Sequence, residues 1–148
     1  MNTPSLVPVV VVDTRAMIES DLPEACALWE RTEGVELSEG DDLSELAAYL
    51  ARNPGASQVA YVGDALAGAV LAGSDGRRGF LYHLAVDPSY RGRGVGRELA
   101  ARALARLRES GVRRVLILVA RDNPEGRAFW QRCGWEPLDF AEPMAIEP

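Results

Sequence analysis

The chain has 148 residues, of which 47% are hydrophobic and 26% are charged, and its formal net charge is −6. These values suit one folded domain over residues 1–148, exclude a disordered chain and make nucleic acid an unfavourable partner. No apolar run approaches the ~20 residues of a membrane span and the N-terminus lacks a secretory signal, so we expect a cytoplasmic protein with no membrane partner.

The first third of the chain predicts a strand followed by two helices. β-Branched residues over Val9–Met17 favour a strand. Residues 20–24 combine a polar cap, a proline and acidic side chains, which start a helix that runs to about Arg31. Asp41 or Asp42 caps a second helix, which carries apolar residues at helical spacing and ends before Asn53.

The middle of the chain predicts β-structure. Two apolar runs, Gln58–Val62 and Ala65–Ala72, flank Gly63-Asp64 and favour a hairpin. A second turn at residues 75–79 leads into a further strand, Phe80–Val86.

The last part of the chain predicts two helices and the remaining strands. A third helix with an apolar stripe ends at Gly111. Residues Val112–Ala120 are almost wholly apolar, so we expect a strand buried on both faces. A short helix follows from Asn123 to Gln131, and Trp135–Ile146 supplies one or two closing strands. The predicted order is β-α-α-β-β-β-α-β-α-β(β), an α/β protein with a mixed sheet.

The chain offers no set of metal ligands. Its two cysteines, Cys26 and Cys133, lie far apart in the sequence, and His83 is the single histidine. A zinc site needs several such side chains at short spacing, so we expect no metal and two free thiols in a reducing compartment.

A turn rich in glycine and arginine, residues 87–97, follows the strand Phe80–Val86 and precedes the third helix. Glycines let the backbone approach a ligand, and their N–H groups form an anion cradle with the positive helix end. The arginines add charge suited to phosphate, so we expect a pyrophosphate here. The turn follows the fourth strand and lacks Gly-Lys-Ser/Thr, which argues against a dinucleotide-binding fold and a P-loop.

Two segments resemble the motifs of one enzyme family. Residues 84–96, with Leu-Ala-Val-Asp-Pro and then Arg-Gly-Arg-Gly-Val-Gly, resemble motif A of the GCN5-related N-acetyltransferases (GNAT). Asn123, Phe129-Trp130 and Gly134-Trp135 resemble motif B. The resemblance implies the GNAT fold, a central, mostly antiparallel sheet whose parallel fourth and fifth strands splay apart to admit acetyl-CoA.

The resemblance also implies how acetyl-CoA is held. The amides of residues 92–97 would hold the pyrophosphate, and Leu84 and Val86 would offer backbone groups to the pantetheine arm. A main-chain N–H near these residues would polarise the thioester carbonyl. Asn123 would contact the pantetheine or the acetyl end. The expected cofactor-binding set is Leu84, Ala85, Val86, Arg91, Gly92, Arg93, Gly94, Val95, Gly96, Arg97 and Asn123.

In the implied reaction a neutral amine attacks the thioester directly and CoA leaves as a thiolate. The chain departs from the family where protons are moved: Trp130 replaces the usual acidic tyrosine, and Leu118 and Phe80 occupy the positions of the two common glutamates. Tyr82 and His83 remain as candidate catalytic residues. Tyr82 lies on the strand face where related enzymes place relay histidines, whereas His83 points away unless a β-bulge reverses the parity.

An acidic loop connects the first two predicted helices. Residues 32–42 contain three glutamates, two aspartates and no basic residue. The acidity extends to the whole first part, since residues 1–64 hold 12 acidic residues and 3 arginines, whereas residues 65–148 hold 10 and 13. The family places this loop over the acceptor cleft, so Glu33 and Glu36 are candidate substrate-binding residues for a cationic amine. A solvated loop with helix-capping acids is the alternative.

Three functions are compatible with these features. The favoured one is an acetyl-CoA-dependent N-acetyltransferase that acts on a primary amine of a small cationic metabolite. The first alternative acetylates protein N-termini or side chains, and the second is a CoA-binding or interaction module without catalysis, which Trp130 keeps open. Homodimers are common in the family, and the sequence does not decide between a monomer and a dimer.

Overall fold

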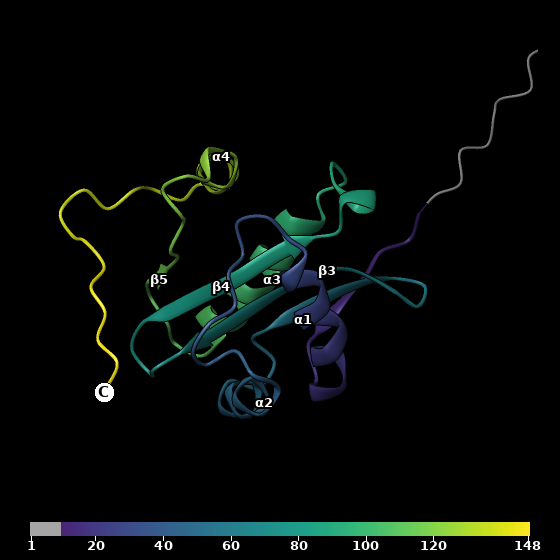
Figure 1. Cartoon of the computed structure of the whole chain (residues 1–148), viewed down its shortest axis with the longest axis horizontal. Helices are drawn as coiled ribbons and strands as arrows, with labels where there is room; N and C mark the ends of the chain where they lie inside the picture. The colour runs from purple at the N-terminus through teal and green to yellow at the C-terminus, as the bar shows by residue number, and fades with distance from the viewer. Residues whose placement is uncertain (1–9) are drawn as a thin grey trace, which may run out of the picture. The chain divides into compact units, whose positions relative to one another are not determined.

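The computed structural model describes residues 10–148, which form two compact units, one ending at Leu118 and one spanning Val119–Pro148. The start of the predicted first strand, Val9, lies outside the described residues. The elements in chain order are β1 (Asp13–Ala16), the 3₁₀ turn η1 (Glu19–Asp21), α1 (Leu22–Glu30), α2 (Leu43–Arg52), β2 (Gln58–Val62), β3 (Ala65–Ser74), β4 (Gly79–Val86), the 3₁₀ turn η2 (Pro88–Tyr90), α3 (Val95–Glu109), β5 (Val115–Leu116) and α4 (Pro124–Arg132) (Figure 1). No helix in this part of the chain is long and apolar enough to cross a membrane.

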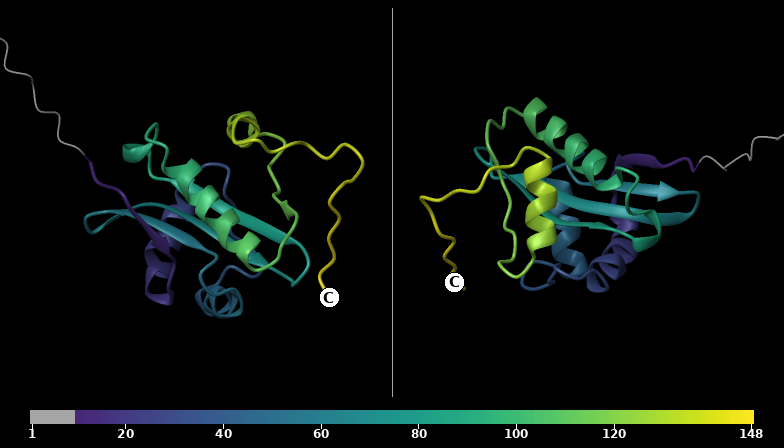
Figure 2. Two further views of the ribbon diagram at one scale, coloured as in Figure 1. Left: turned by 180° about the vertical axis from the view of Figure 1, so that it is seen from behind. Right: turned by 90° about the horizontal axis from the view of Figure 1, so that it is seen from above.

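The first unit is built on a mixed sheet with the strand order β1-β2-β3-β4-β5. The pairs from β1 to β4 are antiparallel, and β5 adds to β4 in parallel. Helices α1 and α2 cover one face of this sheet and α3 covers the other, as Figure 2 shows. The predicted α/β class with a mixed sheet is confirmed.

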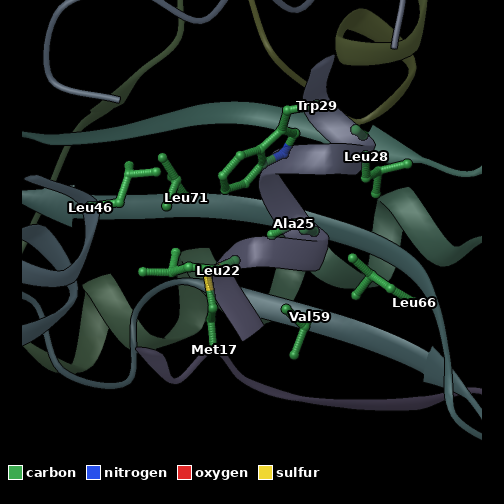
Figure 3. Packing of buried hydrophobic residues seen from close by; sticks show 11 residues of the cluster. Met17, Leu22, Ala25, Leu28, Trp29, Leu46, Val59, Leu66 and Leu71 are labelled. Carbon is green, nitrogen blue, oxygen red and sulfur yellow. The ribbon is translucent and has the colours of Figure 1, made fainter. Parts of the chain in front are cut away.

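The core lies mainly between α1 and the sheet. Trp29 and Leu28 of α1 are fully buried there, with Val59 of β2 and Leu71 of β3 opposite them (Figure 3). On the other face, α3 buries the apolar stripe that the sequence predicts, including Leu99, Ala103 and Leu107. Both faces of the central strands are therefore covered, which explains why β3 is buried along most of its length.

The helix ends follow local sequence chemistry. Asp42 accepts a hydrogen bond from the backbone N–H of Glu45 (2.8 Å), and the Glu45 carboxylate reaches back to the Asp42 N–H. This capping box starts α2 at the second of the two predicted aspartates. Pro23 lies in the first turn of α1, where its missing N–H costs no helical hydrogen bond. The predicted limits of both helices are confirmed to within a residue or two.

A buried carboxylate ties β1, the start of α1 and β2 together. Asp21 is 3% exposed and accepts two hydrogen bonds from the Arg15 guanidinium, at 2.7 and 2.8 Å. It also accepts the Tyr61 hydroxyl (2.9 Å) and the Ile18 N–H (2.8 Å). Burial opposes ionisation, but these hydrogen bonds outweigh it and hold the pKa of Asp21 below its usual value.

Strand β5 is much shorter than the sequence predicts. The expected strand Val112–Ala120, buried on both faces, is reduced to Val115–Leu116, and both of these residues are only half-buried. The β4–β5 ladder consists of two residue pairs at the start of β4, after which Leu118 is 66% exposed. Beyond these two pairs the segment after Leu116 does not pair with β4. Its apolar composition alone therefore does not extend the strand.

The second unit contains α4 and a segment without regular structure. Asn123 begins α4 by accepting the Gly126 N–H (3.0 Å). The rings of Phe129, Trp130 and Trp135 pack edge to face within this unit, with centroids 5.2 Å apart in each successive pair. Residues 133–148 contain no strand, contrary to the one or two closing strands predicted for Trp135–Ile146. Pro137 and Pro143 lack the N–H that a strand ladder requires.

Candidate functional site

The turn between β4 and α3 has a backbone conformation that depends on its glycines. Asp87 begins it by accepting the Ser89 N–H at 2.9 Å. Gly92 and Gly94 adopt left-handed φ values of 77° and 78°, a region that favours glycine. Gly94 is the N-cap of α3, and no side chain caps this helix within the described residues. The start of α3 therefore offers backbone N–H groups that can bind an anion.

Arginine side chains surround this turn. Arg91 and Arg93 are exposed; Arg91 Nε donates to the Val86 carbonyl (3.2 Å), and the Arg93 guanidinium lies over the Tyr90 ring. Val95 and Gly96 are buried at the start of α3, whereas Arg97 is exposed. The structure thus brings together, on one turn, the backbone donors and the cationic groups that the sequence predicts for a pyrophosphate.

The second half of β4 has an open edge. Beyond Phe80 this strand has no ladder to β5, so the backbone of Leu84 and Val86 lies on an edge that another extended chain could join. Ala85 is buried and pairs with Ala69 of β3. The Val86 carbonyl is the exception, because it already accepts the hydrogen bond from Arg91.

A β-bulge interrupts β4 at His83. Ala69 of β3 pairs with Ala85 and Leu71 pairs with Tyr82, so His83 and Leu84 together face the single residue Val70. His83 has a left-handed φ of 55°, the sole non-glycine residue with positive φ in the described part of the chain. The bulge reverses the side-chain alternation, a possibility that the sequence leaves open for His83. As a result, Tyr82 contacts a ring of α2 and His83 contacts a ring of α1.

Tyr82 stacks on Phe80, with ring centroids 5.5 Å apart and planes 6° apart, and meets Tyr49 of α2 edge to face. Burial raises the pKa of the Tyr82 phenol above its usual value. The hydroxyl therefore keeps its proton near neutral pH, and Tyr82 can donate a proton or a hydrogen bond more readily than accept a proton.

His83 is paired with Asp41, a loop residue that is not among the predicted catalytic residues. Its Nε2 lies 3.0 Å from Oδ1 of Asp41, and its ring contacts the buried ring of Trp29 at a centroid distance of 5.4 Å. Asp41 belongs to the acidic loop that the sequence does identify. Its pairing with His83 bridges 42 residues, and no local sequence signal reports it.

The acidic loop borders a cavity of about 370 Å³. Three acidic residues, Glu30, Asp41 and Asp42, line it, and it contains no basic residue among its lining side chains, which are Pro23, Cys26, Ala27, Glu30, Leu37, Asp41, Asp42 and Leu43. The predicted substrate-binding residues Glu33 and Glu36 are exposed on the same loop and do not line this cavity. The loop is therefore acidic as predicted, but the acids at the cavity are different ones.

Cys26 does not have the surroundings of a nucleophile. Cys26 and Cys133 are half-buried free thiols. Burial, followed by the charges of Glu30 and Asp41, raises the pKa of Cys26. A raised pKa reduces the thiolate fraction, and the thiolate is the reactive form.

In the second unit, Asn123 and Trp130 have structural partners. The Asn123 side-chain carbonyl caps α4, which leaves its amide nitrogen as the donor for a ligand. Trp130 lies between Phe129 and Trp135. An indole N–H is too weak an acid to protonate a thiolate, so this position does not supply the family's usual general acid.

Comparisons with known proteins agree with this geometry. The model of the acetyltransferase (GNAT) family matches residues 22–135. The acetyltransferase YE1169 of Yersinia enterocolitica is 30% identical over 128 residues, which cover 86% of this chain and 90% of that protein.

Two solved structures share the fold. AAC(6')-Iy in complex with the bisubstrate analog CoA-S-monomethyl-acetylneamine superposes with a TM-score of 0.74 at 20% identity, over 93% of this chain and 99% of that one. The aminoglycoside acetyltransferase meta-AAC0020, from an uncultured soil metagenomic sample and in complex with sisomicin, gives 0.70 at 17% identity, over 92% and 97%.

Proposed function

This chain belongs to the acetyltransferase (GNAT) family and is an N-acetyltransferase, and we propose that it transfers the acetyl group of acetyl-CoA to a primary amine of a small cationic molecule. The observation that carries the proposal is the N-terminus of α3, which no side chain of residues 10–148 caps. It is preceded by Gly92 and Gly94 in left-handed conformations and by two exposed arginines. A diphosphate is the group that such donors and charges suit.

We further propose that residues 1–148 act as one catalytic domain in the cytoplasm. In support, the family match begins in α1 of the first unit and ends at residue 135 of the second. Motif A lies in the first unit and motif B in the second, so a truncated chain that ends at Leu118 would lose Asn123 and its helix.

The proposed acetyl-CoA site is built on motif A of the first unit. The N–H groups of residues 92–97 would bind the pyrophosphate, with Arg91, Arg93 and Arg97 adding positive charge. The open edge of β4 over residues 84–86 would pair with the pantetheine arm. The contact of Asn123 with the cofactor stays a prediction from the resemblance to motif B. When bound, acetyl-CoA supplies an acetyl group activated as a thioester.

In the proposed reaction the amine nitrogen forms the new C–N bond to the acetyl carbonyl carbon. The C–S bond breaks, its electron pair leaves with sulfur as the CoA thiolate, and the amine loses one proton. A main-chain N–H of the β4 bulge would stabilise the charge that develops on the carbonyl oxygen. His83 lies in this bulge and Tyr82 next to it, with ring centroids 6.3 Å apart, and we propose that one of the two relays the proton.

The acidic loop supports a cationic acceptor. Glu33 and Glu36 on its surface, together with the acids of the cavity, create a negative potential that would attract an ammonium-bearing molecule. The fold neighbour meta-AAC0020 is an aminoglycoside acetyltransferase bound to sisomicin, which is consistent with a small amine as acceptor.

A screen of amines with acetyl-CoA tests the proposed function. The reaction is measured by the release of the free CoA thiol. Cationic polyamines and amino sugars are expected to be acetylated in preference to neutral or anionic amines. Tight CoA binding without acetylation of any amine would instead support a non-catalytic CoA-binding protein, and acetylation of protein N-termini alone would support the protein-directed alternative.

The double variant Glu33→Gln/Glu36→Gln is expected to raise KM for a cationic amine by about threefold to tenfold with little change in kcat, because the loop acids act by long-range attraction. The effect should shrink as salt is added. The matched control is Glu19→Gln/Asp64→Asn, which removes two exposed charges elsewhere in the first unit. An equal rise in KM in both double variants would show that only net charge matters, and not the loop.

A further inference from the structure

We propose that Asp41 is a positioning residue that fixes the tautomer of His83, so that the imidazole Nδ1 accepts the proton of the acceptor amine. The inference rests on the proposed amine acetylation and assigns the proton acceptor within it. It explains why a loop residue and a strand residue 42 positions apart meet in a largely buried pair.

Both oxygens of the Asp41 carboxylate have polar partners. Oδ1 lies 3.0 Å from His83 Nε2, and the two side chains are only 13% and 16% exposed. Oδ2 accepts the backbone N–H of Ser38 at 2.9 Å, so both oxygens are held in place. An ionised carboxylate only accepts hydrogen bonds, which requires the neutral imidazole to carry its hydrogen on Nε2 and its lone pair on Nδ1.

The imidazole of His83 is held from three directions. The β4 bulge sets its backbone at a φ of 55°, a conformation that costs energy outside glycine and that is retained mainly at functional sites. The buried Trp29 ring contacts it at a centroid distance of 5.4 Å with a 54° tilt. Asp41 restrains the third side. A ring held in this way presents Nδ1 in one direction, as a proton acceptor requires.

Asp41 can also stabilise the charge that the proposed reaction creates on His83. When Nδ1 takes the proton of the attacking amine, His83 becomes an imidazolium, and the Asp41 carboxylate at 3.0 Å neutralises it. The imidazolium then returns the proton to solvent. Tyr82, whose ring is 6.3 Å from the imidazole, keeps its own proton because burial raises the pKa of its phenol, so it does not compete as the base.

The test is favourable because His83 is the single histidine of the chain. Nitrogen-15 NMR of histidine-labelled protein reports its tautomer without ambiguity and without acetyl-CoA. The wild-type ring, in its neutral form, is expected to carry its hydrogen on Nε2. A wild-type ring with its hydrogen on Nδ1 would overturn the proposal.

The variant Asp41→Asn supplies the second readout. Its side-chain oxygen is expected to keep the Ser38 N–H and its amino group to face Nε2, which forces the ring hydrogen onto Nδ1. We expect kcat to fall about 100-fold, in the range of general base catalysis, while KM changes less than threefold. If Asp41→Asn has the ring hydrogen on Nδ1 but keeps the kcat of the wild type, Nδ1 is not the proton acceptor.

Two further variants separate positioning from a structural effect. Asp42→Asn removes one charge beside the same cavity and keeps a good helix cap, so the ring hydrogen should stay on Nε2. His83→Gln should lower kcat to the level of Asp41→Asn, and the double variant should fall no further. Additive losses would show that the two residues act separately. If the wild-type tautomer is as expected but no amine is acetylated, the proposed function fails while the Asp41–His83 arrangement stands.

Discussion

Alanine at Gly94 is expected to weaken acetyl-CoA binding about tenfold or more. Gly94 has a φ of 78° at the N-cap of α3, and an alanine there costs about 1–2 kcal/mol in the left-handed region. A Cβ at this position would meet no atom within 4 Å, so the cost is conformational and not a clash. We expect the turn to relieve this strain by moving its N–H groups away from the proposed diphosphate site, and titration calorimetry with acetyl-CoA measures the loss of affinity.

Gly111 provides a matched control at the other end of α3. It follows the helix with a φ of 90°, and its Cβ would likewise meet nothing within 4 Å. Gly111→Ala should therefore lower the Tm by an amount similar to that of Gly94→Ala and leave acetyl-CoA affinity unchanged. Equal losses of affinity in the two variants would mean that helix stability, and not the shape of the turn, governs binding.

The second large effect concerns stability. Asp21→Asn is expected to lower the free energy of unfolding by about 3 kcal/mol, because it removes a buried charge and leaves Arg15 without its paired carboxylate. Arg15 is about half exposed, so water recovers part of the loss. Denaturant unfolding at neutral pH measures the difference. Asp64→Asn, an exposed turn residue, should change stability by less than about 0.5 kcal/mol.

The same variant should change the pH dependence of folding. The pKa of Asp21 is lower in the folded protein than in the unfolded chain, so its stabilising effect is complete above the unfolded value of about 3.9. The effect disappears as the pH falls through the lower folded pKa. Wild type should therefore lose stability more steeply than Asp21→Asn on acidification below about pH 5. Parallel curves for the two proteins would contradict the assignment.

The predictable parts of this molecule are those written in short stretches of sequence. Asp42 and Glu45 cap α2 through contacts three residues apart, and Gly92 and Gly94 supply the left-handed turn before α3. Even the β4 bulge has a local signal, because histidine tolerates the left-handed conformation better than most residues. Strand length was less predictable: Val112–Ala120 has the composition of a buried strand, but a strand extends only as far as a neighbour pairs with it.

The sequence by itself therefore determined the helices, the antiparallel hairpins, the glycine-rich turn before α3 and the family. These follow from local propensity, capping and glycine conformations, which depend on residues a few positions apart. Only the tertiary structure decided that Asp41 meets His83, that Glu30, Asp41 and Asp42 border the cavity, and that Arg15, Asp21 and Tyr61 share one buried network. Such pairings depend on how a loop and several strands pack together. Residues that are tens of positions apart in the sequence form no local pattern from which their contact could be predicted.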